Sequence, residues 1–90
     1  MSYGFLIDPT SDPKIINELL MVVNELLPTS MEIIIEYNES IDVYCISLYV
    51  DDKYSGQLGT CVSKRQLWRI YERLLSIYMV LERLKEKVMV

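Results

Sequence analysis

The sequence contains no histidine, and glycine, proline and cysteine are scarce. Three glycines, three prolines and two cysteines occur among its 90 residues. Without histidine, the commonest general base and metal ligand is missing, and no glycine-rich phosphate loop or nucleophile elbow is present. Cys45 and Cys61 form no metal-binding or redox motif, and we interpret each as a small core residue rather than a reactive thiol. We therefore predict that the chain is not an enzyme and binds neither a metal nor a cofactor.

Alanine is also absent, and so are long hydrophobic runs. A lack of alanine is typical of AT-rich genomes, such as those of many small phages, viruses and some thermophiles, and it favours a protein of viral type. The longest apolar run is far shorter than the ~20 residues that span a bilayer. Residues 1–9 carry neither the basic flank nor the small-residue cleavage site of a signal peptide. The expected location is the cytoplasm.

Charge is distributed unevenly along the chain. Residues 1–52 contain ten Asp or Glu against one Lys, a net charge of −9, whereas residues 53–90 contain eight Lys or Arg against three Glu, a net charge of +5. The two halves together give the net charge of −4. Such a split predicts a surface with two signs of charge, suited to self-association or to one anionic partner.

Hydrophobic periodicity predicts a helix followed by three strands. An Asp-Pro pair at residues 12–13 begins a helix, because the carboxylate can accept free N–H groups and proline needs no donor at the first helical position. Pro28 ends this helix. Residues 31–37 and 42–50 alternate between apolar and polar side chains, as half-buried strands do. Residues 54–61 indicate a weaker third strand, in which two glycines predict a bulge or a close approach by another backbone.

A long helix is predicted at the C-terminal end. It begins at Ser63, where Gln66 completes a capping box, and it reaches about residue 88. The expected fold class is α+β, in the order (β)-α-β-β-β-α. Three strands form an antiparallel meander with both helices on one face, in a single domain over residues 1–90. Residues 1–11 are expected to form an N-terminal arm or a short edge strand.

The apolar pattern of this last helix is wider than a small domain can cover. Leucine or valine and isoleucine or leucine recur in a heptad pattern over three repeats, with aromatic and methionine side chains beside them. We interpret the excess as a homodimer interface, and the alternative is that every one of these side chains belongs to the intramolecular core. The predicted interface residues are Leu67, Trp68, Ile70, Tyr71, Leu74, Leu75, Ile77, Tyr78, Leu81 and Leu84.

Two charged surfaces are further candidates. A basic stripe at the start of the last helix could bind phosphates, together with the free N–H groups of the first turn, or could be a solvated face that pairs with the acidic half. Its residues are Lys64, Arg65, Arg69 and Arg73. An acidic surface could block a basic nucleic-acid site of another protein. Its residues are Glu32, Glu36, Asp42, Asp51 and Asp52.

A glycine-containing strand end that leads into Ser63, Lys64 and Arg65, within the order α-β-β-β-α, resembles the double-stranded-RNA-binding domain. In that family a lysine-rich first turn of the last helix straddles phosphates, so the resemblance implies an RNA-backbone contact at Lys64 and Arg65. The shared topology covers residues 13–80, and Trp68 stands where that family places a third lysine. The same order also resembles the core of small acidic dimeric secretion chaperones, which bury apolar segments of their partners.

These observations favour a small non-enzymatic protein–protein interaction module. We expect it to form a homodimer through the long C-terminal helix, to bind another protein, and to act as an inhibitor or adaptor of viral type. The alternative is a nucleic-acid-binding regulator that uses the basic stripe. A membrane partner is not expected.

Overall fold

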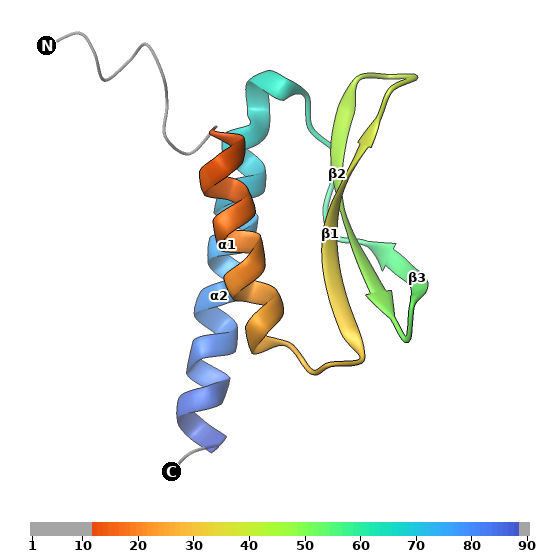
Figure 1. Cartoon of the computed structure of the whole chain (residues 1–90). Coiled ribbons are helices and arrows are strands. Elements are labelled where there is room, and N and C mark those ends of the chain that lie inside the picture. The colour runs from red at the N-terminus through yellow and green to blue at the C-terminus, as the bar shows by residue number, and fades with distance from the viewer. Residues whose placement is uncertain (1–11, 89–90) are drawn as a thin grey trace, which may run out of the picture.

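The computed structural model describes residues 12–88 as two helices packed on one face of a three-stranded antiparallel sheet (Figure 1). The elements are α1 (Pro13–Leu26), β1 (Met31–Asn38), β2 (Val43–Val50), β3 (Lys53–Gln57), a 3-10 turn η3 (Lys64–Gln66) and α2 (Leu67–Val88). This confirms the predicted α+β meander with a long C-terminal helix. The arm or edge strand expected in residues 1–11 lies outside the described residues.

Helix α1 begins and ends where the sequence predicts. The side chain of Asp12 accepts a hydrogen bond from the backbone N–H of Lys14 at 2.9 Å, and proline occupies the first helical position. Leu27 is already extended, so the helix closes just before Pro28. The helix buries Ile16 and Val23 against the rest of the domain.

The sheet has the order β1-β2-β3, so β2 is its central strand. β1 pairs with β2 over its whole length, from Met31 opposite Val50 to Asn38 opposite Val43. β3 pairs with β2 through a register shift that leaves Ser55 as an extra residue beside Gly56, which confirms the predicted bulge.

The predicted third strand is too long, because β3 ends at Gln57. Leu58 donates its N–H to the carbonyl of Ile46 at 2.8 Å, and Tyr44 and Val62 exchange both backbone hydrogen bonds. Five residues, 58–62, therefore face the three residues 44–46 of β2. The surplus residues leave the ladder at Gly59, whose φ of +80° is accessible to glycine at little cost.

The last helix does not begin with the predicted capping box. Ser63 makes no side-chain cap hydrogen bond, and the backbone N–H of Gln66 bonds to the carbonyl of Ser63 at 2.9 Å instead. Lys64–Gln66 therefore form a 3-10 turn, and the α-helix proper begins at Leu67. α2 then runs for 22 residues and extends beyond both α1 and the sheet (Figure 1).

The core lies between the helices and the inner face of the sheet. Its buried residues come from every layer: Ile16, Val23, Ile33, Ile46, Val62, Leu67, Ile70 and Leu74. Within residues 12–88, neither helix combines the length and the apolar composition that crossing a bilayer requires.

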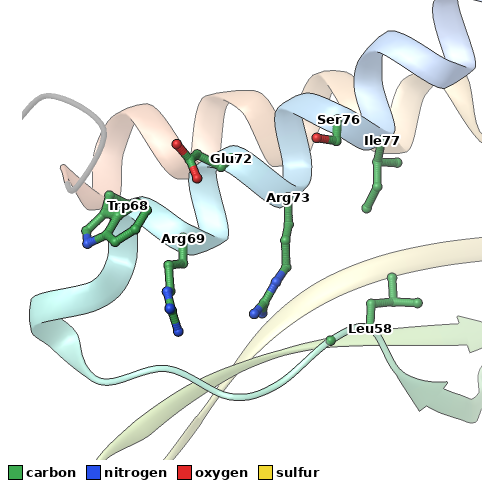
Figure 2. A pocket seen from close by; sticks show the side chains of 8 residues that line it. Leu58, Trp68, Arg69, Glu72, Arg73, Ser76 and Ile77 are labelled. Carbon is green, nitrogen blue, oxygen red and sulfur yellow. The ribbon is translucent and has the colours of Figure 1, made fainter.

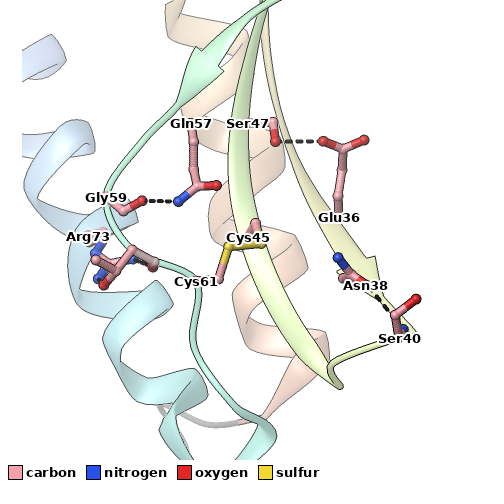
Figure 3. The surroundings of a disulfide bond; sticks show 10 residues. Glu36, Asn38, Ser40, Cys45, Ser47, Gln57, Gly59, Cys61 and Arg73 are labelled. Atoms are coloured by element: carbon pink, nitrogen blue, oxygen red, sulfur yellow. Dashed lines mark hydrogen bonds between the residues drawn. A yellow bond between two sulfur atoms is a disulfide. The ribbon is translucent and has the colours of Figure 1, made fainter.

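The interpretation of the two cysteines as separate core residues is wrong, because Cys45 and Cys61 form a disulfide (Figure 3). Tyr44 and Val62 are a hydrogen-bonded pair, so the next residues along the ladder face each other as a non-hydrogen-bonded pair, where strands approach most closely. Their Cα atoms are 4.3 Å apart. The bond lies on the outer face of the sheet, because Cys45 pairs with Glu36 on the side opposite the buried Ile46.

Candidate functional site

The first half of α2 is part of the core. Leu67, Ile70 and Leu74 are each at most 5% exposed and pack within the hydrophobic cluster of their own chain. Their assignment to a homodimer interface is therefore wrong. The heptad pattern predicted the apolar face correctly, but α1 and the sheet cover this half of it.

Four other predicted interface residues are divided between core and solvent. Tyr71, Ile77, Tyr78 and Leu81 are partly buried and pack against the core cluster. The Glu82 carboxylate, as a hydrogen-bond acceptor, raises the pKa of Tyr78 above that of a free tyrosine. These residues line the boundary of the exposed surface rather than its centre.

The exposed apolar surface of α2 lies mainly in its second half. Leu75 is 37% exposed and Leu84 is 53% exposed, as the interface prediction expects, and Met79 and Val80 are 51% and 56% exposed. Val80 was missed because it stands outside the heptad positions. We call Leu75, Met79, Val80 and Leu84 the apolar arm. Most of it lies in the blue part of α2 that leads to the C-terminus in Figure 1.

A groove of about 680 Å³ runs between α2 and the chain segment that follows β3 (Figure 2). Leu58 and Gly59 form one wall. The other wall is α2, from which Figure 2 shows Arg69, Arg73 and Ile77 pointing towards the Leu58 segment. The complete lining is Leu58, Gly59, Trp68, Arg69, Glu72, Arg73, Ser76 and Ile77.

Arg73 binds the segment after β3, which forms one wall of this groove. Its Nη1 donates to the carbonyl of Thr60 at 2.5 Å, and its Nη2 donates to the Thr60 hydroxyl at 3.1 Å. Gln57 donates to the carbonyl of Gly59 at 2.7 Å (Figure 3). These side chains satisfy carbonyls that leave the β2 ladder. A Cβ atom at Gly59 would lie 2.9 Å from the Arg73 guanidinium, so a larger residue would displace the Arg73 side chain in addition to straining the backbone at this φ.

Arg69 is exposed and lies beside Trp68, with its guanidinium carbon 5.6 Å from the centre of the indole ring. This is a cation–π arrangement. Lys64 and Arg65 are exposed in η3, and Lys64 lines a separate cavity of about 220 Å³ near Tyr44. Of the four predicted anion-site residues, the structure therefore brings only Arg69 and Arg73 together in one groove.

The predicted acidic surface is split. Glu36 lies on the outer sheet face, where Ser47 Oγ and Tyr49 Oη donate to its carboxylate at 2.6 and 3.1 Å. Asp42 lies in the β1–β2 loop and accepts a hydrogen bond from Tyr37 Oη at 2.7 Å, which raises the pKa of that phenol.

The other acidic residues lie towards the opposite end of the strands. Asp51 and Asp52 form the two-residue turn between β2 and β3, and both have a positive φ. Glu32 lies on β1, where it pairs with Tyr49 of β2. In the part of the chain that the structure describes, no three His, Cys, Asp or Glu side chains are arranged to hold a metal ion.

Comparison of the chain with protein-family models, with curated proteins and with solved structures finds no match. The two family resemblances noted from the order of elements therefore receive no support beyond that order. The function has to be argued from the surfaces of α2.

Proposed function

We propose that the chain is a non-enzymatic protein–protein interaction module that forms a homodimer through the apolar arm of α2. The observation that carries the proposal is the exposure of four large apolar side chains within ten consecutive residues of one helix. Leu75 and Met79 are one turn apart, as are Val80 and Leu84, so the arm presents two short apolar ridges. Burial of such side chains contributes about 25 cal/mol per Å² of apolar surface, and methionine is common at protein interfaces.

The test is the mass in solution of the unmodified protein and of the double variant Met79→Glu, Leu84→Glu. We expect a dimer at micromolar concentration for the unmodified protein and a monomer for the variant. The variant should keep its circular dichroism, because both side chains are about half exposed in the single chain. A substitution at Leu74 would be unsuitable, since that residue belongs to the core.

Ile41→Glu is the matched control, because Ile41 is 66% exposed in the β1–β2 loop, away from α2. This variant should remain dimeric. A monomeric unmodified protein at micromolar concentration, or a monomeric Ile41→Glu variant, would contradict the proposed interface.

The cation–π contact between Arg69 and Trp68 favours a second candidate, a nucleic-acid-binding regulator. An aromatic ring beside exposed cations is a common platform for bases and phosphates. This candidate predicts retarded migration of duplex DNA, duplex RNA or single-stranded RNA at low salt. Retardation should fall steeply with salt and be lost in the triple variant Lys64→Ala, Arg65→Ala, Arg69→Ala. Unchanged migration of all three nucleic acids would remove the candidate.

The inhibitor or adaptor role, the viral type and the cytoplasmic location remain predictions from sequence. The disulfide bears on the last of these, because disulfides persist in oxidising compartments and are rare in the cytosol. It therefore favours an oxidising environment over a reducing one.

A further inference from the structure

The groove between α2 and the segment after β3 is a second surface of the same helix. None of its lining residues belongs to the apolar arm, which it meets only at Val80 through an adjoining cavity. Its length follows α2 from Trp68 to Ile77, over more than two helical turns. An adjoining cavity of about 260 Å³, lined by Ser76, Ile77, Val80 and Leu81, continues it along the helix. Both share Ser76 and Ile77, so the surface is one elongated depression.

The groove combines an apolar part with a cationic end. Leu58 and Ile77 lie on opposite walls, and Trp68 stands at the end where α2 begins (Figure 2). The guanidinium carbon of Arg69 lies 5.6 Å from the centre of the indole ring, and Figure 2 shows the Arg69 side chain pointing towards the Leu58 segment, so its cationic end faces the groove. Figure 2 shows the carboxylate of Glu72 pointing away from the Leu58 segment, whereas Arg69 points towards it, so Glu72 does not occupy the space in front of the Arg69 guanidinium.

The wall opposite α2 is held in place before any partner arrives. Arg73 binds Thr60 through two hydrogen bonds, and the disulfide joins the neighbouring Cys61 to β2. A groove with fixed walls loses little conformational entropy on binding.

From this geometry we infer that the groove binds a short segment of another protein that carries a carboxylate beside a large apolar side chain. The carboxylate pairs with Arg69, and the apolar side chain fills the space between Leu58 and Ile77. Charge complementarity requires an anionic group on the partner, because the Arg69 side chain points into the groove and an arginine can make a bidentate contact with a carboxylate. The inference goes beyond the proposed homodimer, since it names a different surface and a different partner.

A nucleic acid fits the depression less well than a peptide. Four side chains of the depression, Leu58, Ile77, Val80 and Leu81, offer neither hydrogen bonds nor charge to a phosphate backbone. The chain also carries a net charge of −4, which opposes a polyanion at long range. A peptide with a single carboxylate uses both the cationic end and the apolar part.

The experiment selects displayed random twelve-residue peptides on the full chain and measures their affinity through the fluorescence of Trp68. Trp68 is the only tryptophan and lines the groove, so its emission reports on occupancy directly. We expect the selected peptides to share an Asp or Glu next to Leu, Ile, Phe or Trp and to shift the emission. Arg69→Glu should weaken their binding by about tenfold or more, and Arg69→Lys should recover only part of it, because lysine keeps the charge but cannot make the bidentate contact.

Arg83→Glu is the matched control, because it makes the same charge change at an exposed position of α2 outside the groove. It should bind the selected peptides as the unmodified protein does. The arm variant Met79→Glu, Leu84→Glu should also bind them. A result that contradicts the homodimer therefore does not contradict peptide binding by the groove, and a failure of peptide binding does not contradict the homodimer.

Four results would overturn the inference. The first three are the absence of any enriched peptide, enrichment of peptides without acidic residues, and equal peptide affinity of Arg69→Glu and the unmodified protein. The fourth is tighter binding of oligothymidylate or single-stranded RNA than of any peptide, together with loss of that nucleic-acid binding in Arg69→Glu. The last result would assign the groove to the nucleic-acid alternative instead.

Discussion

Asn24 occupies part of the free edge of β1. Its side-chain Nδ2 donates to the carbonyl of Ile33 at 2.8 Å, and its Oδ1 accepts the Ile33 N–H at 2.8 Å. In the described sheet β1 has a strand neighbour on one side only, so the N–H and C=O of Ile33 would otherwise face outward without a partner. The amide thus replaces one residue of a neighbouring strand and interrupts an edge on which another chain could pair.

We expect Asn24→Ala to lower the free energy of unfolding by about 2 kcal/mol, because two partly buried backbone groups lose their partners. The variant should also aggregate more readily, since the β1 edge becomes continuous. Urea denaturation and light scattering at fixed protein concentration measure both effects. Asn17→Ala is the control, because Asn17 is exposed on the same helix, and its unfolding free energy should change by less than about 0.5 kcal/mol. Equal stability of the two variants would contradict this role for Asn24.

The segment between β3 and α2 is organised by covalent and side-chain links rather than by a regular ladder. Two hydrogen-bonded contacts with β2 hold its ends, and the Arg73 and Gln57 side chains hold its middle. The Cys45–Cys61 disulfide closes a loop with a sequence separation of 16 residues, which contains β3.

We expect loss of this disulfide to destabilise the fold by about 3 kcal/mol, the loop-closure entropy of a chain segment of this length. The double variant Cys45→Ser, Cys61→Ser should unfold at a lower urea concentration than the unmodified protein. A reducing agent should lower the midpoint of the unmodified protein and leave that of the double variant unchanged. A midpoint of the unmodified protein that is insensitive to reductant would mean that the bond contributes no stability.

The elements that the sequence predicted correctly are those set by local rules. Asp12 caps α1 because a carboxylate can reach N–H groups two residues ahead, and the alternation from Met31 onward makes β1 half buried whatever surrounds it. Pro28 follows the end of α1 by the same kind of local restriction.

The elements that were predicted wrongly depend on partners distant in the sequence. Val62 pairs with Tyr44 and is buried, which places Ser63 at the end of a ladder contact rather than at a free helix start. The disulfide follows from the register of that same pair, which no cysteine spacing reveals. Likewise, the heptad pattern predicts which face of α2 is apolar, but not how far along that face α1 and the sheet extend. Leu74 and Leu84 therefore look equivalent in sequence, although Leu74 is 0% exposed and Leu84 is 53% exposed.

The molecule as a whole is a thin two-layer structure from which one helix extends. Its principal extents are 45, 36 and 18 Å, and the shortest agrees with one helix layer on one sheet. The second half of α2 therefore has few elements beside it within a single copy. A helix of this kind opens locally unless something covers it, because most helical stability comes from the packing of its apolar face.

Hydrogen exchange followed by mass spectrometry distinguishes a free arm from a covered one. In the proposed dimer, backbone amides around Met79 to Leu84 should exchange slowly at micromolar concentration, at rates close to those of the core turn around Ile70. In the variant Met79→Glu, Leu84→Glu, the amides of the arm should exchange about tenfold or more faster, whereas those around Ile70 should not change, because that part is buried in the single chain. Fast exchange of the arm in the unmodified protein, unaffected by protein concentration, would show that no second copy covers it. The concentration dependence is decisive, since a dimer interface protects only in proportion to the dimer that is present.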